Sequence, residues 1–295
     1  MLITSRYSIL KKIFFKKKNS FGFTLHTTIN RYEHNYEELI YEINRIDAVA
    51  MERLTPSPYV MDIYGFCGMS AITEFGQGNF KSVVDEATPL EKLKYARDVA
   101  AGLASAHYID GYDHNITLVH NDLNPSNVMM NHGNAKLNDF NVGIMMTWHR
   151  RENRPCRFKS MFANAQWRAP EEQFIDGEYS NEPLSEKIDV YALGNIFFRI
   201  IAGHDPWKEY KVEGRISSED QNDIAKHKRF DGDLPDFLDP EMVNTSIPEI
   251  KAIYDAMFKC FQKLPNDRPT AVEIERELNQ AYTFLVKQNL SSATG

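Results

Sequence analysis

The 295-residue sequence is short of cysteine and of positive charge. Its three cysteines, Cys67, Cys156 and Cys260, lie far apart and form no CxxC pair. This spacing indicates neither a zinc site nor a disulfide framework, so we expect a reducing, cytoplasmic setting. Acidic residues outnumber lysine and arginine, and the net charge is −7. Nucleic acids and membrane surfaces attract cationic protein faces, so this balance argues against both kinds of partner.

Long hydrophobic runs are also missing at the start of the chain. Residues 1–18 mix apolar residues with lysines, and their uncharged stretches are too short for a signal-peptide core or an integral membrane span. We expect residues 1–20 to form a basic N-terminal segment, a solvated strand edge or a frayed terminus rather than a lipid-binding element. Glycine is scarce here as well, because Gly22 is the only glycine in the first sixty residues.

The first third of the chain has mixed strand and helix patterns. Hydrophobic residues make up 42% and charged residues 25% of the sequence, which is typical of a globular protein with a buried core. Alternation and aromatic content predict strands at residues 21–29, 59–64 and 70–75. Apolar residues at helical spacing predict a helix over residues 37–54.

Helical patterns dominate the rest of the chain. Thr88 and Glu91 can close a capping box at the start of a helix over residues 89–107. A second helix, over residues 189–202, is apolar almost all round, which predicts burial on every side. Gly203 is placed to end it.

These two regions predict two lobes joined by a short hinge. No internal repeat or low-complexity block interrupts them. The expected fold is α+β and bilobal, with a small β-rich lobe over residues 21–76, a larger helical lobe over residues 77–285 and a tail over residues 286–295.

Two short segments carry the strongest chemical signal. Residues 120–127 read His-Asn-Asp-Leu-Asn-Pro-Ser-Asn, and residues 136–141 read Lys-Leu-Asn-Asp-Phe-Asn. Asp122, Asn127 and Asp139 together offer the oxygen ligands that Mg²⁺ takes alongside substrate phosphates. Phosphoryl transfer also needs one carboxylate to orient the attacking hydroxyl. Either segment alone reads equally well as a turn, but the two in this order favour a phosphotransfer site.

In these segments the chain resembles the eukaryotic protein kinase family, through an HxDxxxxN loop and a DFG-type motif. We call residues 120–127 the catalytic loop and residues 139–141 the metal motif. The resemblance extends over residues 22–285 and implies ATP and Mg²⁺ as cofactors. It also implies that Asp122 is the catalytic base, that Asn127 and Asp139 are metal ligands, and that His120 and Phe140 have structural roles.

Aminoglycoside and choline phosphotransferases share the catalytic loop, and three later segments favour protein kinases over them. These segments are residues 167–171 (WRAPE), 189–194 (DVYALG) and 264–270 (LPNDRPT). The resemblance implies a buried ion pair between Glu171 and Arg268. It also implies that Asp189 braces the backbone of the catalytic loop.

The sequence departs from the family at positions that handle the ATP phosphates. No GxGxxG precedes Phe21, and the position of the strand lysine falls near His26. The acidic helix position falls on Asp47, with Glu42 as second choice. A neutral imidazole cannot reproduce a long ammonium arm, although a protonated His26 or a lysine among residues 16–18 offers a partial substitute.

Two further replacements lie in the catalytic loop and the metal motif. Asn124 stands in place of the loop lysine, and it removes a cation from the transferred phosphate. Asn141 stands in place of glycine, where we expect asparagine to tolerate a left-handed backbone.

The resemblance also places the hinge and hints at the substrate. Thr73, Glu74 and Phe75 form the expected hinge, with Thr73 at the gatekeeper position and the following backbone groups facing adenine. Residues 148–159 are basic, which is typical either of a solvated loop or of a site for acidic substrates.

The expected function is Mg²⁺-dependent transfer of the ATP γ-phosphoryl group to a protein hydroxyl. The Pro-Ser pair in the catalytic loop favours serine and threonine over tyrosine as acceptors. The main alternative is a pseudokinase, an interaction module with little or no turnover, which the missing glycine loop, His26 and Asn124 favour. A small-molecule kinase is a third possibility.

Overall fold

A computed structural model gives the fold of the chain. It describes residues 23–27, 38–68, 70–112, 115–160, 164–180, 182–235 and 245–293. The basic segment expected at residues 1–20 lies outside these described residues.

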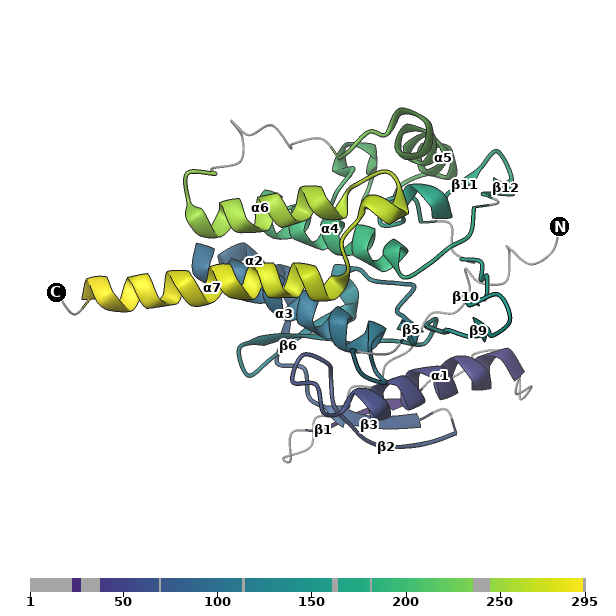
Figure 1. Cartoon of the computed structure of the whole chain (residues 1–295), viewed down its shortest axis with the longest axis horizontal. Helices are drawn as coiled ribbons and strands as arrows, with labels where there is room; N and C mark the ends of the chain where they lie inside the picture. The colour runs from purple at the N-terminus through teal and green to yellow at the C-terminus, as the bar shows by residue number, and fades with distance from the viewer. Residues whose placement is uncertain are drawn as a thin grey trace.

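The smaller lobe is an antiparallel sheet with one long helix (Figure 1). The strands are β1 (Phe23–Thr27), β2 (Ile63–Cys67) and β3 (Ser70–Glu74), in the order β1-β3-β2. Helix α1 (Glu38–Leu54) contacts β2 and buries Ala50, Met51 and Leu54. Its periodicity is the one the sequence predicts, because the apolar residues recur at helical spacing.

One predicted strand is displaced. The sequence predicts a strand over residues 59–64, but β2 begins only at Ile63. The preceding backbone pairs elsewhere: Tyr59 accepts a hydrogen bond from the N–H of Leu137 (2.9 Å), and Met61 donates to the Leu137 carbonyl (2.8 Å). These contacts are long-range in sequence, so local alternation could not reveal them.

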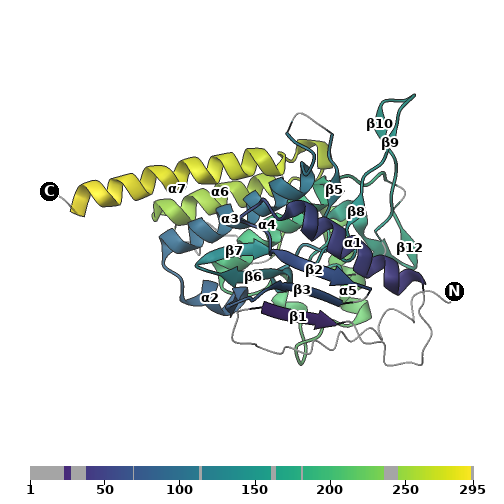
Figure 2. The same ribbon diagram turned by 90° about the horizontal axis from the view of Figure 1, so that it is seen from below.

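The larger lobe is built from helices (Figure 2). They are α2 (Phe80–Glu86), α3 (Pro89–His107), α4 (Lys187–Ala202), α5 (Ser218–Lys226), α6 (Pro248–Cys260) and α7 (Ala271–Ala293). The predicted capping box of α3 is present, with Thr88 and Glu91 bonding each other's backbone N–H. Helix α4 is buried along most of its length and ends at Gly203, whose φ is 73°. The sequence expectations for both helices are confirmed.

Short strands and turns position the loops between the lobes. The strands are β4 (Gly78–Asn79), β5 (Leu118–Val119), β6 (Val128–Asn131), β7 (Asn134–Leu137), β8 (Ile144–Met145), β9 (Trp148–His149), β10 (Arg154–Pro155), β11 (Phe174–Ile175) and β12 (Glu178–Tyr179). The catalytic loop connects β5 to β6, and the metal motif follows β7 directly. Because β6 and β7 are antiparallel neighbours, the two functional segments emerge at the same end of one hairpin.

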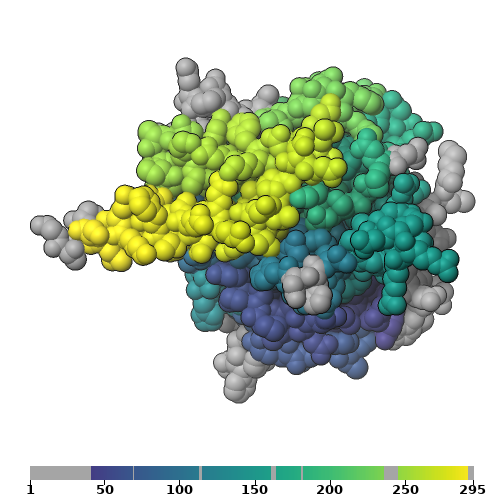
Figure 3. Space-filling model, in the orientation of Figure 1, coloured from purple at the N-terminus to yellow at the C-terminus, as the bar shows by residue number. Residues whose placement is uncertain are grey.

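A single large core joins the two lobes. It runs from Met51 of α1 through Leu123 and Phe140, beside the catalytic loop, to Phe197 of α4 and Met257 of α6. Figure 3 shows the two lobes packed into one body, with α7 projecting at one end. Among the described residues, none of the helices combines the length and apolar character that crossing a membrane would require.

Candidate active site

Asp189, at the start of α4, binds the backbone of the catalytic loop. This buried carboxylate accepts hydrogen bonds from the backbone N–H groups of His120 (2.7 Å) and Asn121 (2.9 Å). Nε2 of His107, at the end of α3, lies 3.0 Å from the same carboxylate. Burial alone would raise the pKa of Asp189, but His107 and these N–H groups outweigh it and lower the pKa. The contact of Asp189 with the loop backbone is the one that the family resemblance implies, whereas no sequence pattern indicated His107.

The Asn127 side chain holds Asp122 in place. Its amide nitrogen donates to the Asp122 carbonyl (2.8 Å) and to the Asp122 carboxylate (3.1 Å). The amide oxygen of Asn127 therefore points to the other side, where it can serve as a ligand. Although 42% of the Asp122 side chain is exposed, surrounding protein raises the pKa of its carboxyl group, and the negative charge of Asp139 adds to this. The positive charge of Arg168 opposes the shift.

Arg168 is a contact of Asp122 that the sequence analysis did not single out. Its Nη2 lies 3.4 Å from Asp122 Oδ1, and its Nη1 lies 3.1 Å from Glu172 Oε1. Nη1 also donates to the backbone carbonyl of Asn121. Burial raises the pKa of the Glu172 carboxyl group, and the Arg168 charge opposes that rise. A buried guanidinium thus stands beside the predicted base, brought there from 46 residues further along the chain.

Asn124 is used within the catalytic loop itself. Its side-chain oxygen accepts from the N–H of Ser126 (2.9 Å), and its side-chain nitrogen donates to the Asp122 carbonyl (2.9 Å). Both ends of the amide are engaged, so Asn124 caps the 3₁₀ turn η2 (Pro125–Asn127).

The metal motif contains one residue with a left-handed backbone, Asp139. Asp139 has φ of 65°, whereas Asn141 is not among the residues with positive φ. The tolerance expected of Asn141 is therefore not called upon here, and the left-handed residue is an aspartate, a type that also enters this conformation. Phe140 is fully buried and stacks on His120 with ring centroids 4.7 Å apart.

Asp47 of α1 reaches this motif. Its Oδ1 accepts a hydrogen bond of 2.7 Å from the backbone N–H of Phe140. Glu42, the second choice for the acidic helix position, is instead 44% exposed and pairs with Arg45. The geometry therefore favours Asp47 of the two. The His26 backbone lies opposite Ala71 in the sheet, and its side chain lies outside what the structure describes.

The hinge residues are tied to the β6–β7 hairpin. Thr73 is buried, and its hydroxyl donates to the Glu74 carbonyl (3.2 Å). The Glu74 side chain forms an ion pair with Lys136 (2.6 Å) and accepts a hydrogen bond from Asn131. Phe75 follows where β3 has ended and the chain crosses to the helical lobe. Adenine contacts here would come from backbone groups, because the Glu74 carboxylate is engaged elsewhere.

The predicted ion pair between Glu171 and Arg268 is present. The two guanidinium nitrogens of Arg268 donate to the two carboxylate oxygens at 2.6 and 2.9 Å, and both side chains are buried. Arg268 also donates to the backbone carbonyls of Gln262, Lys187 and Lys263. The pair ties the segment 167–171, which contains Arg168, to the segment 264–270 of the helical lobe.

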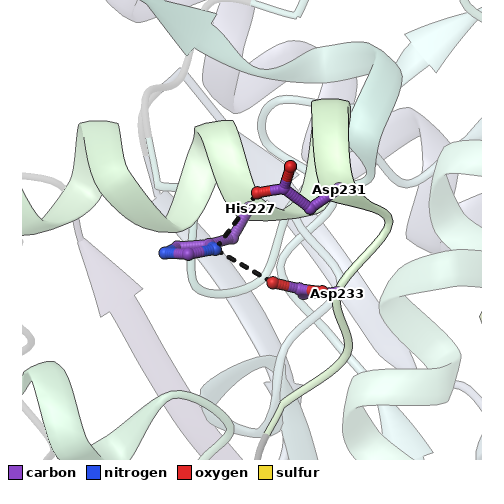
Figure 4. A group of neighbouring side chains, drawn as sticks. All are labelled: His227, Asp231 and Asp233. Carbon is purple, nitrogen blue, oxygen red and sulfur yellow. Dashed lines mark hydrogen bonds and ion pairs between the residues drawn. The ribbon is translucent and has the colours of Figure 1, made fainter.

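A second polar cluster lies on the π-helical turn η5 (His227–Asp231) after α5 (Figure 4). His227 Nδ1 is 2.9 Å from Asp233 and 3.3 Å from Asp231, and among the described residues this is the one group of three His, Cys, Asp or Glu side chains close enough to share a metal ion. Both aspartates are exposed, and ordinary ion pairing accounts for the contacts. The neighbouring Lys228 is buried, and its ammonium group donates to the carbonyls of Ala165, Gln166 and Arg168.

The donor set between the lobes fits a hard cation. Asp139 supplies a carboxylate and Asn127 an amide oxygen, the ligand types that Mg²⁺ takes together with phosphate oxygens. The clamp on the Asn127 nitrogen leaves its oxygen available for that purpose.

Comparison with known proteins agrees with this geometry. Residues 31–279 match the family described as the protein kinase domain. A probable serine/threonine-protein kinase, roco9, of Dictyostelium discoideum is 26% identical over 77% of this chain and 6% of its own length. Mitogen-activated protein kinase kinase kinase 5 of Arabidopsis thaliana is 28% identical over 60% of this chain and 20% of its own length. The receptor-like kinase ERL1 of the same plant is 22% identical over 88% of this chain and 26% of its own length. The chain thus spans a minor part of these relatives, and it belongs to the protein kinase domain family.

Proposed function

We propose that the chain transfers the γ-phosphoryl group of ATP, with Mg²⁺, to serine or threonine hydroxyls of proteins. The observation that carries this proposal is the Asn127 clamp, which orients the Asp122 carboxylate. The backbone carbonyl of Asn127 accepts in turn from the N–H of Asn138, the neighbour of Asp139 (2.9 Å). Several relatives are named as serine/threonine-protein kinases, which supports the acceptor class.

In this reaction Asp122 accepts the proton of the attacking hydroxyl while the new O–P bond forms and ADP leaves. The raised pKa of Asp122 makes its carboxylate a stronger proton acceptor than an ordinary aspartate. Bound Mg²⁺, held by Asp139 and Asn127, would supply charge neutralisation at the phosphates. Asp47 holds the backbone of the metal motif from the smaller lobe, which keeps the Asp139 side chain in place.

A specific observation supports the second candidate, a nucleotide-binding interaction module with little turnover. Asn124 offers no cation to the transferred phosphate, and both ends of its amide are engaged within the loop. Phosphoryl transfer depends mainly on such charges, so losing one lowers the rate without abolishing nucleotide binding.

Both candidates require nucleotide binding. Thermal melting with ATP, with and without Mg²⁺, tests it. At about a hundred times the dissociation constant, ATP should stabilise the chain by about 2.7 kcal/mol. Asp139→Asn should remove the part of the shift that depends on Mg²⁺, and the exposed control Asp255→Asn should keep it. No shift in the unmodified chain under either condition would refute both candidates.

Transfer to a protein acceptor then separates the two candidates. In the proposed kinase, Asp122→Asn retains the ATP-induced shift and loses phosphoryl transfer. Transfer at the same rate in Asp122→Asn would contradict the assigned base. Nucleotide binding with no transfer in the unmodified chain would favour the interaction module.

A further inference from the structure

An unpaired basic surface follows the metal motif. Strands β9 and β10 form a hairpin at the edge of the molecule, and Figure 2 shows it standing clear of the helical lobe. Four exposed cations lie on or after this hairpin, and within the described ranges no carboxylate pairs with them: Arg150, Arg151, Arg157 and Lys159. Arg154 of the same segment differs, because it pairs with Glu152. In a chain of net charge −7, four neighbouring cations without partners are an uncompensated positive surface.

Two of the four cations, Arg157 and Lys159, line a cavity of about 210 Å³. Ser160, Tyr179 and Ser180 are among the other lining residues. Ser160 is only 2% exposed, and its hydroxyl has no hydrogen-bond partner among the described residues. A buried hydroxyl without a partner is costly, and a ligand oxygen in the cavity would satisfy it.

Three glutamates also line the cavity, and each forms an ion pair with an arginine. Glu171 pairs with Arg268 at 2.6 Å, Glu172 with Arg168 at 3.1 Å, and Glu182 with Arg229 at 2.9 Å. The charges left unpaired at the cavity are therefore both positive, those of Arg157 and Lys159. This arrangement fits an anionic group and disfavours a cation.

The cavity lies close to the proposed base. Glu172 lines the cavity, and the Arg168 guanidinium bridges it to Asp122, with contacts of 3.1 and 3.4 Å. An extended peptide advances about 3.3 Å per residue, so a substrate with its hydroxyl at Asp122 could reach the cavity with a side chain a few residues away.

We propose that this cavity and the basic surface beside it bind acidic side chains of the protein substrate, near the acceptor hydroxyl. The inference deepens the proposed kinase function and names its substrate class as acidic peptides. The recognised group is an anionic oxygen cluster, either the carboxylate of Asp or Glu or a phosphate already present on the substrate.

Peptide binding to the full chain, measured without ATP, tests the inference independently of turnover. Three fluorescent peptides share one serine and carry at the flanking positions Asp and Glu, their amides Asn and Gln, or phosphoserine. Anisotropy should show about tenfold tighter binding of the acidic peptide than of the amide peptide, with affinity falling as salt rises. The relative affinity of the phosphoserine peptide identifies which anion the cavity prefers.

Matched variants locate the binding. Arg157→Gln combined with Lys159→Gln should abolish most of the preference for the acidic peptide, and Ser160→Ala should weaken it further. The control combines Arg276→Gln with Lys287→Gln, which removes the same charges from the exposed face of α7. Equal affinity for the acidic and amide peptides, or equal loss in the control, would overturn the inference. So would tighter binding of a charge-matched oligonucleotide than of the acidic peptide.

The same peptides separate this inference from the proposed function. Phosphoryl transfer at the same KM to acidic and amide peptides would overturn the inference and leave the kinase activity standing. Selective binding of the acidic peptide without any transfer would refute the kinase activity and support the binding surface.

Discussion

Removing the Arg268 guanidinium should destabilise the chain more than almost any surface change. In Arg268→Met the carboxylate of Glu171 stays buried and loses both of its hydrogen bonds. Breaking one partner of a buried ion pair costs about 3 to 5 kcal/mol. Three backbone carbonyls also lose the same donor, which puts the expected cost in the upper half of that range. Native domains are stable by only about 5 to 15 kcal/mol, so the effect is a large share of the total.

Urea unfolding followed by circular dichroism measures this cost. The exposed pair of Lys259 and Glu277 is the control, because its nitrogen and oxygen atoms are just as close, at 2.6 Å, while its side chains are 51% and 40% exposed. Lys259→Met should cost about 0 to 1 kcal/mol. If Arg268→Met costs no more than Lys259→Met, the argument from burial is wrong.

A double variant tests the cause of the loss. Glu171→Gln combined with Arg268→Met leaves no uncompensated charge in the same volume. Removing both charges together should cost clearly less than the sum of the two single variants, since each single variant strands one charge. Strict additivity would show that the two side chains act through their separate contacts and not through each other.

Two other predictions concern Lys228 and Asn124. Burial lowers the pKa of Lys228 to about 7, and Glu172 only partly opposes this. The unfolded chain, with an ordinary lysine pKa near 10.4, binds the extra proton between about pH 7 and pH 10, so stability should rise with pH across that window. Urea midpoints from pH 7 to 9.5 should show this slope, and Lys228→Met should reduce it; an undiminished slope in the variant would refute the assignment. Asn124→Lys should raise the rate of phosphoryl transfer about tenfold by adding a cation, while losing the cap lowers stability by about 1 kcal/mol. Asn124→Ala, which loses the cap alone, should show the stability loss without the gain in rate.

Much of the fold was predictable because the relevant signals are local. The cap of α3 and the glycine that ends α4 are each decided by a few neighbouring residues, and both elements lie where the sequence indicates. The pair of Glu171 and Arg268 was predictable for another reason. It follows from the order of motifs shared with a known family, not from any property of a lone glutamate or arginine.

The remaining features depend on contacts between distant segments. The shift of β2 to Ile63 reflects pairing of the preceding residues with Leu137. His107 contacts Asp189, which lies 82 positions later in the chain, and no local sequence pattern around either residue predicts the contact. The positive φ of Asp139 was not expected, and the neighbouring Phe140 N–H bonds Asp47, which lies 93 positions earlier in the chain.

Contacts of Lys228 and Arg168 lead from the turn η5 to the proposed base, Asp122. The Lys228 ammonium group holds three carbonyls of the segment 165–168, and Arg168 at its end touches Asp122. A neutral Lys228 has one N–H fewer than the ammonium form, so it cannot satisfy all three carbonyls at once. Burial lowers the pKa of Lys228, and loss of its proton would remove one of the donors that hold the segment 165–168. Asp122 is therefore held by two side chains, those of Asn127 and Arg168, and the backbone carbonyl of Arg168 accepts in turn from Lys228.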